Sequence, residues 1–136
     1  MPAIGEVARL TGTKVPTIRF YEQEGLLPAP PRAANGRRIY SDADIRRLSF
    51  IRHARALGFE LDSIRSLLAL TDRPNAPCMQ ADAIARAHLD AIEQRIAQLT
   101  LLKAELTRIA QACAGGRAIG DCRVIEALAG RARLGE

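Results

Sequence analysis

The three cysteines of this 136-residue chain are the side chains best suited to chemistry. Cys78 and Cys113 are five heptads apart, and Cys122 follows Cys113 after an eight-residue segment that contains three glycines. A segment so rich in glycine is flexible enough to fold two thiols around one point. Three thiolates form a soft ligand set that suits Zn, Cd, Pb or Hg and suits Mg or Ca poorly. The alternatives are small buried hydrophobes or reactive thiols.

A long helix must carry two of these cysteines at its ends. The chain from Met79 to Ala112 contains neither glycine nor proline, which predicts one continuous helix, about 51 Å long at 1.5 Å per residue. Cys78 and Cys113 therefore cannot meet within one chain, because a disulfide needs Cα atoms within about 7 Å. In an antiparallel dimer the start of one helix lies beside the end of its partner. We expect a metal site made of Cys78 from one subunit and Cys113 and Cys122 from the other, with two sites per dimer.

Apolar residues along this helix alternate by four and three positions, which is typical of a coiled-coil seam. The one polar misfit is Lys103. Such a stripe would be an aggregation site if it stayed exposed, and the rest of the chain is too small to cover it. We therefore expect a homodimer held by an antiparallel coiled coil. The seam positions are Ala85, Leu89, Ile92, Ile96, Leu99, Lys103, Leu106, Ala110 and Cys113.

The amino-terminal half has the signals of a helix-turn-helix. Helical spacing that starts at Ile4 ends at Gly12, a residue suited to a left-handed helix end. A second helix, from Lys14 to Gln23, has Pro16 in its first turn, where the missing N–H costs little. Two short helices joined by a tight turn with glycine form a helix-turn-helix, although an ordinary helical hairpin has the same spacing.

The next segment indicates a wing and two more helices. Asn35-Gly36 in the middle of residues 32–40 is the sequence signal of a tight β-hairpin. The segment from Ser41 to Asp44 resembles a capping box, which predicts a helix that ends at Gly58. Residues 61–70 supply another short helix, and we expect Phe20 to pack in the core of this domain.

Charge and composition exclude several classes of protein. The formal net charge is +5, and from Arg9 to Arg55 ten basic residues stand against four acids, which indicates a polyanionic partner. No apolar run approaches the roughly 20 residues of a membrane span, so we expect a cytoplasmic protein that does not bind membranes. His53 and His88 are the only histidines. Neither accompanies a cysteine or serine at a recognisable catalytic spacing, so we do not expect an enzyme.

Five segments together resemble the MerR family of bacterial transcriptional regulators, and in particular its branch that responds to divalent soft metals. The resemblance implies a mainly α fold with a winged helix-turn-helix head over residues 1–75, a dimerisation helix over 76–112, and a metal-binding loop with a short helix over 113–136. The wing departs from the family at Arg37, where many relatives carry an aromatic residue. The segments are Ile4-Gly5-Glu6-Val7-Ala8, Thr17-Ile18-Arg19-Phe20-Tyr21-Glu22, Gly25-Leu26-Leu27, Asn35-Gly36-Arg37-Arg38-Ile39-Tyr40 and Ile51-Arg52-His53-Ala54-Arg55-Ala56-Leu57-Gly58-Phe59.

The resemblance also implies how the head binds promoter DNA. The helix from Lys14 to Gln23 would enter the major groove while the wing contacts the adjacent backbone, and Arg19 would touch a base or a phosphate at the groove edge. Members of the family repress without inducer and, once inducer binds, underwind the DNA so that RNA polymerase can use both promoter elements. The residues expected to contact phosphates are Lys14, Thr17, Tyr21, Arg32, Arg37, Arg38, Tyr40 and Arg55.

The resemblance bears on the metal as well. Metal-sensing members carry cysteines at these three positions, and Val124–Leu128 resembles the short helix that covers their loop. Copper(I) sensors have a serine where Cys78 stands, which argues for a divalent ion here. Zinc sensors have a further Cys and His in the loop, so Asp121 or water would have to complete a zinc shell. We rank lead and cadmium first, mercury next and zinc after them.

Two other classes of regulator share this fold. A redox or electrophile sensor would use Cys113 or Cys122 as a reactive thiol, with a pKa lowered by Arg117 or Arg123. Drug-sensing relatives usually append a larger ligand domain, whereas only 14 residues follow Cys122.

Overall fold

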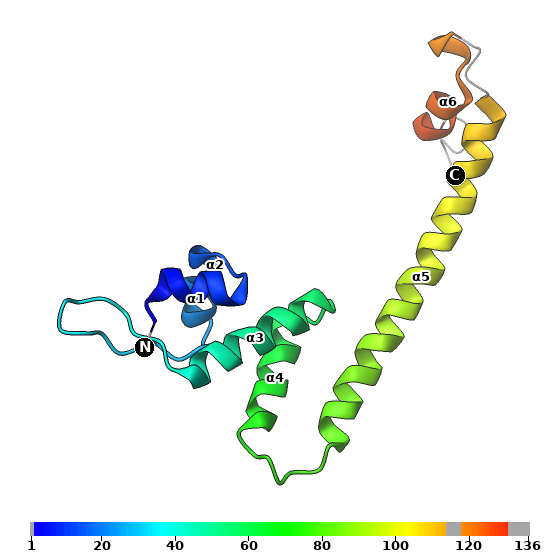
Figure 1. Ribbon diagram of the computed structural model, residues 1–136. Coiled ribbons are helices and arrows are strands. Elements are labelled where there is room, and N and C mark those ends of the chain that lie inside the picture. Colours follow the sequence, from blue (N-terminus) through cyan, green and yellow to red (C-terminus); the bar gives the residue numbers. More distant parts are fainter. Residues whose placement is uncertain (1, 114–117, 131–136) are drawn as a thin grey trace. The chain divides into compact units, whose positions relative to one another are not determined.

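The computed structural model of the chain describes residues 2–113 and 118–130 (Figure 1). These residues divide into two compact units, 1–86 and 87–136, and the long helix α5 contributes to both. Within the described residues the fold is helical, with one isolated antiparallel bridge, Arg32 to Arg38, in place of regular strands. The elements are α1 (Ile4–Thr11), α2 (Val15–Gln23), α3 (Asp42–Ala56), α4 (Leu61–Thr71), α5 (Met79–Cys113), the 3-10 helix η1 (Ile119–Asp121) and α6 (Arg123–Ala129).

Local sequence signals set the ends of the helices in the first unit. Gly12 follows α1 with a φ of 65°, the left-handed conformation that glycine adopts most readily. The Ser41 side chain accepts from the Asp44 amide, and the Asp44 carboxylate accepts from the Ser41 amide, so the predicted capping box opens α3. Pro16 lies in the first turn of α2, as expected.

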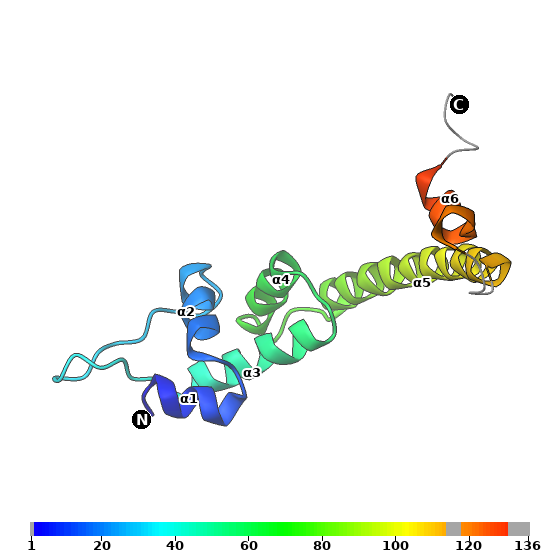
Figure 2. The ribbon, with the colours of Figure 1, turned by 90° about the horizontal axis from the view of Figure 1, so that it is seen from above.

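One core holds α1 to α4 together. Figure 2 shows these helices gathered around α3. The buried side chains come from every helix of the group and from the segments between them. Phe20 is not among them, because 43% of its surface is exposed, and the expectation that it packs in the core is wrong. Its neighbour Tyr21 faces inward instead, with the two ring centroids 5.9 Å apart. The core consists of Val7, Ile18, Tyr21, Leu26, Leu27, Tyr40, Leu48, Ile51, Ala54, Ile64 and Leu68.

The second unit is built on the carboxyl-terminal part of α5. The helix is unbroken through Cys113, and η1 and α6 pack against each other beyond it. Along α5 the seam residues Leu89, Ile92, Ile96, Leu99 and Leu106 are exposed in the single chain. No helix in the described part of the chain is long and apolar enough to cross a membrane.

Candidate functional site

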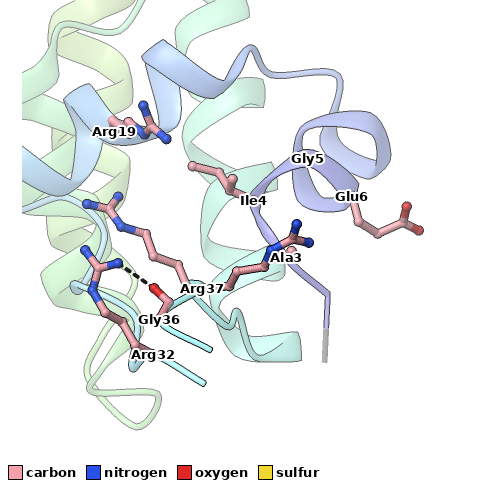
Figure 3. Close-up of a pocket in the computed structure, with 9 residues that line it drawn as sticks. Ala3, Ile4, Gly5, Glu6, Arg19, Arg32, Gly36 and Arg37 are labelled. Carbon is pink, nitrogen blue, oxygen red and sulfur yellow. Dashed lines mark hydrogen bonds between the residues drawn. The ribbon is translucent and has the colours of Figure 1, made fainter. Parts of the chain in front are cut away.

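An arginine cleft lies in the first unit, where the amino-terminal end of α1, the helix α2 and the wing meet (Figure 3). Its volume is about 510 Å³, and four arginines line it against a single acid, Glu6. Figure 3 shows the Glu6 carboxylate directed away from the arginines, and it is paired with Arg9 at 2.5 Å. The cleft is therefore a concave cationic surface. Its lining residues are Ala3, Ile4, Gly5, Glu6, Arg19, Arg32, Gly36, Arg37 and Arg38.

The wing is a short hairpin held by its own backbone. The Ala33 amide donates to the Arg37 carbonyl at 2.7 Å, and the Ile39 amide donates to the Pro31 carbonyl at 2.9 Å. Gly36 closes the turn with a φ of 83°, and the Asn35 side chain accepts from the Arg37 amide at 3.0 Å. The predicted Asn-Gly hairpin is confirmed. The segment projects away from α1 to α4 in both ribbon views (Figures 1 and 2), and residues 34–37 at its turn are exposed.

The structure divides the predicted DNA-contacting residues into exposed, half-buried and buried groups. Thr17 and Arg38 are half-buried. Arg55 is exposed, and its guanidinium donates to the Phe59 carbonyl at 2.9 Å. Tyr21 and Tyr40 both lie in the core, and no part of Tyr40 is accessible to solvent. The exposed group consists of Lys14, Arg19, Arg32, Arg37 and Arg55.

Arg38 and Tyr40 share a partner that the sequence did not single out. The Glu22 carboxylate, only 7% exposed, accepts from the Arg38 guanidinium and from the Tyr40 hydroxyl, the latter at 2.5 Å. Burial, together with the hydrogen bond to Glu22, raises the pKa of Tyr40 to about 12. Glu22 is the last but one residue of α2, whereas both partners lie beyond the turn of the wing. No periodicity links residues so far apart, so only the family motif could have drawn attention to Glu22.

The second unit brings two of the three cysteines together. Cys113 is the last residue of α5, Cys122 caps the start of α6, and their sulfur atoms are 3.5 Å apart. Two sulfurs bound tetrahedrally to one ion at about 2.3 Å would lie roughly 3.8 Å apart, so this spacing fits shared coordination. All three cysteines are thiols in the described part of the chain. Among the described residues of the single chain, no three His, Cys, Asp or Glu side chains gather to hold a metal ion.

The remaining cysteine belongs to the first unit. Cys78 is exposed and lies at an apolar cavity of about 270 Å³ formed by residues of α3, α4 and the start of α5. Near the thiol pair, Asp121 is exposed, and the Arg123 guanidinium lies 3.5 Å from the Glu126 carboxylate. Arg117, which was expected to lower a thiol pKa, lies outside the described residues.

Comparison with known proteins gives matches over nearly the whole chain. Residues 3–71 match the MerR HTH family regulatory protein family, and residues 45–109 match the MerR DNA-binding family. The HTH-type transcriptional regulator ZntR of Escherichia coli K12 is 38% identical over 94% of this chain and 92% of its own length. The mercuric resistance operon regulatory protein of Pseudomonas fluorescens is 37% identical over 96% of this chain and 90% of its own. The crystal structure of the regulator PbrR691 from Ralstonia metallidurans CH34 in complex with lead(II) superposes with a TM-score of 0.84 at 38% identity, covering 94% of this chain and 99% of that one.

Proposed function

Because this chain belongs to the MerR family of metal-responsive, DNA-binding transcriptional regulators, we propose that it binds promoter DNA as a homodimer and activates transcription on binding a divalent soft metal ion. Its relatives are regulators and not enzymes. The observation that carries the metal half of the proposal is the 3.5 Å separation of the Cys113 and Cys122 sulfurs. The arginine cleft carries the DNA half.

The DNA half rests on exposed cations that converge on one surface. Arg19 comes from α2, and Arg32 and Arg37 come from the wing, so the cleft can accept phosphates from adjacent positions of one DNA backbone (Figure 3). We assign these three arginines, together with Lys14, Thr17 and Arg55, to direct contacts. Tyr21 and Tyr40 are assigned to the scaffold below that surface, since both are buried. Affinity for DNA should fall steeply with salt because each neutralised phosphate releases counterions.

The proposed homodimer rests on the exposed apolar seam of α5. Half of the Leu99 side chain is accessible in the single chain, and the other large seam residues are exposed in the same way. Pairing with a second α5 would remove this surface from water, and an antiparallel pairing would bring Cys78 of the partner subunit toward the thiol pair of this one. The site would then hold one ion on three thiolates, with two ions per dimer.

The choice of metal follows from the number of ligands. A three-thiolate shell suits large soft ions such as lead, cadmium and mercury, whereas zinc normally takes a fourth ligand, here Asp121 or water. The likeness to a regulator solved with lead(II) supports lead as the first ion to test, with cadmium beside it and mercury and zinc next. When bound, the ion would tie the second unit of one subunit to the first unit of the other.

Activation would follow if the ion favours one arrangement of the two heads over another. A ligand shifts a conformational equilibrium only by its difference in affinity for the two states. We propose that the metal binds more tightly to the state that underwinds the promoter for RNA polymerase. Equal metal affinity of the protein on relaxed and on underwound DNA would contradict this mechanism.

Mixing two variants tests the shared site. Cys78→Ser and Cys113→Ser homodimers each lack a complete site, but their heterodimer regains one from its two unmutated halves. Tight binding of lead(II) or cadmium(II) should return in the mixture. A mixture of Cys113→Ser with Cys122→Ser is the matched control, because no combination of those chains restores a complete site. If neither mixture recovers tight binding, the shared site is wrong.

The thiol pair also favours a second candidate, a redox sensor of the same fold. Sulfurs 3.5 Å apart need to approach by roughly 1.5 Å to form a disulfide, whose S–S bond is about 2.05 Å long. Transcriptional activation of metal-free protein by a mild oxidant, lost in Cys122→Ser, would favour this function. Activation by metal under reducing conditions favours the metal sensor.

A further inference from the structure

The Glu22 carboxylate joins two parts of the cationic surface that are separate in the sequence. It lies at the end of α2, the helix that carries Arg19, and its two oxygens bind residues on the returning arm of the wing, residues 37–40. One oxygen accepts from the Arg38 guanidinium, and the other accepts from the Tyr40 hydroxyl at 2.5 Å. Both contacts are largely shielded from water. A buried carboxylate is costly unless it is paired and hydrogen-bonded, and here it has both kinds of partner.

The same arm is fixed at its base by backbone contacts. The Tyr40 amide donates to the Pro2 carbonyl at 3.1 Å, and the Tyr40 side chain is completely buried. Tyr40 therefore ties the end of the wing both to the segment before α1 and, through Glu22, to α2. Only Arg38 and Ile39 lie between this anchor and Arg37, and the Ile39 amide is itself bound to the Pro31 carbonyl.

The alternation of side chains along this arm separates Arg38, which is paired with Glu22, from Arg37, which is exposed. In an extended segment, residues two apart point to the same side. Arg38 and Tyr40, two residues apart, both reach Glu22, while Arg37, the residue before Arg38, stays exposed. Arg38 is 30% exposed and its guanidinium is engaged by the carboxylate. It is therefore poorly placed to neutralise a phosphate, unlike Arg37.

We propose that Glu22 is a positioning residue for DNA binding: through Arg38 and Tyr40 it holds the wing at a fixed distance from α2, so that Arg19, Arg32 and Arg37 reach phosphates together. This inference rests on the proposed DNA-binding function and adds to it. It reassigns Arg38 and Tyr40 from phosphate contacts to supports of the wing. It also predicts that Glu22→Gln, which removes a negative charge, weakens binding to DNA.

The negative charge of DNA makes this direction of change informative. Glu22→Gln removes a negative charge from a surface that binds a polyanion, so charge alone predicts tighter binding to DNA. The positioning role predicts weaker binding, because the wing loses its ion pair and Arg32 and Arg37 no longer act together with α2. Tyr40→Phe should act in the same direction although it changes no charge and no exposed atom.

The experiment measures DNA affinity against salt concentration. The probe is a labelled duplex that the wild-type chain selects from a random library, titrated over a series of KCl concentrations. Each phosphate contact contributes about 0.9 to the slope of log affinity against log salt. Glu22→Gln and Tyr40→Phe should each weaken binding roughly tenfold, the scale of a lost hydrogen bond to a charged group. Each should also lower the slope by about 2 per subunit, whereas Arg37→Gln should lower it by about 1.

A double substitution separates support from contact. If Arg38 acts only through Glu22, then adding Arg38→Gln to Glu22→Gln causes no further loss of affinity or slope. A further drop of about 1 per subunit in the slope of log affinity against log salt would mean that Arg38 itself neutralises a phosphate. It would overturn the reassignment. The matched control is Glu105→Gln, which removes the same charge from an exposed ion pair with Arg108 on α5, outside the DNA-binding unit. It should leave binding unchanged or slightly tighter.

The outcomes distinguish the two proposals. If wild type selects no duplex, DNA binding itself is wrong. If wild type binds and folded Glu22→Gln binds as tightly or more tightly, the positioning role is wrong while DNA binding stands. If circular dichroism shows Glu22→Gln unfolded, Tyr40→Phe decides alone, and a slope equal to that of wild type overturns the inference.

Discussion

Replacing one leucine on the seam of α5 should weaken the dimer, and replacing another two residues away should not. Leu99 lies on the seam, and 51% of its surface is exposed in the single chain. Full burial of a leucine side chain is worth about 1.5 to 3 kcal/mol, so covering the exposed half contributes about 1 kcal/mol per subunit. Leu99→Ala removes most of this from both subunits, about 2 kcal/mol per dimer, and any cavity left behind adds to the loss.

The measurement is the dimer Kd by sedimentation equilibrium. About 2 kcal/mol corresponds to a rise in Kd of about thirtyfold for Leu99→Ala. Leu101 is the matched control, because it has the same side chain on the same helix, is 72% exposed, and points to the opposite face. Leu101→Ala should leave the Kd within about twofold of wild type, as surface substitutions usually do. Equal effects of the two substitutions would refute the seam, and with it the antiparallel pairing.

Three further predictions concern the fold and the thiols. Gly12→Ala should destabilise the first unit by about 1 to 2 kcal/mol in urea unfolding, because φ is 65° and the new Cβ would lie 3.3 Å from the Arg52 guanidinium; Gly5→Ala, with nothing within 4 Å, should be neutral or stabilising. Tyr40, whose pKa burial and its carboxylate partner raise to about 12, should still be protonated when an unfolded tyrosine has ionised. The contribution of Tyr40 to the free energy of unfolding should therefore be fully present below about pH 10. It should fall by up to about 3 kcal/mol between about pH 10 and 12, a loss that is absent in Tyr40→Phe. Lead(II) binding to the thiols should release protons and tighten as pH rises, as followed by thiolate-to-metal absorption, and a pH-independent affinity would argue against thiolate ligands.

Features set by neighbouring residues could be predicted from the sequence. Gly12, Pro16 and the Ser41 cap act within one turn of the helix that they end or begin, so the sequence around each of them is sufficient. The Asn35-Gly36 turn is of the same kind. The continuous α5 follows from a long stretch without helix breakers.

Features that depend on packing between distant segments could not be predicted. Phe20 and Tyr21 are adjacent aromatic residues, and nothing local decides which of them faces the core. The answer comes from packing between segments that are distant in the sequence, and Tyr21 is the one that joins the core. The family resemblance implies a phosphate contact for Tyr40, but the Tyr40 hydroxyl has a buried partner in Glu22. An ion pair between residues 22 and 38 leaves no trace in helical or strand periodicity.

In the proposed metal site, affinity and signal come from different thiols. Cys113 and Cys122 already lie 3.5 Å apart within the second unit, so an ion bound to these two alone has no reason to prefer one head arrangement. Cys78 belongs to the unit that also holds α2 and the wing, so only the bond to Cys78 of the partner subunit can carry that preference. Allosteric coupling usually amounts to about 1 to 3 kcal/mol, and here it must reside in that third bond. Cys78→Ser should therefore keep a weakened two-thiolate site but lose the transcriptional response to metal, whereas Cys122→Ser should lose both.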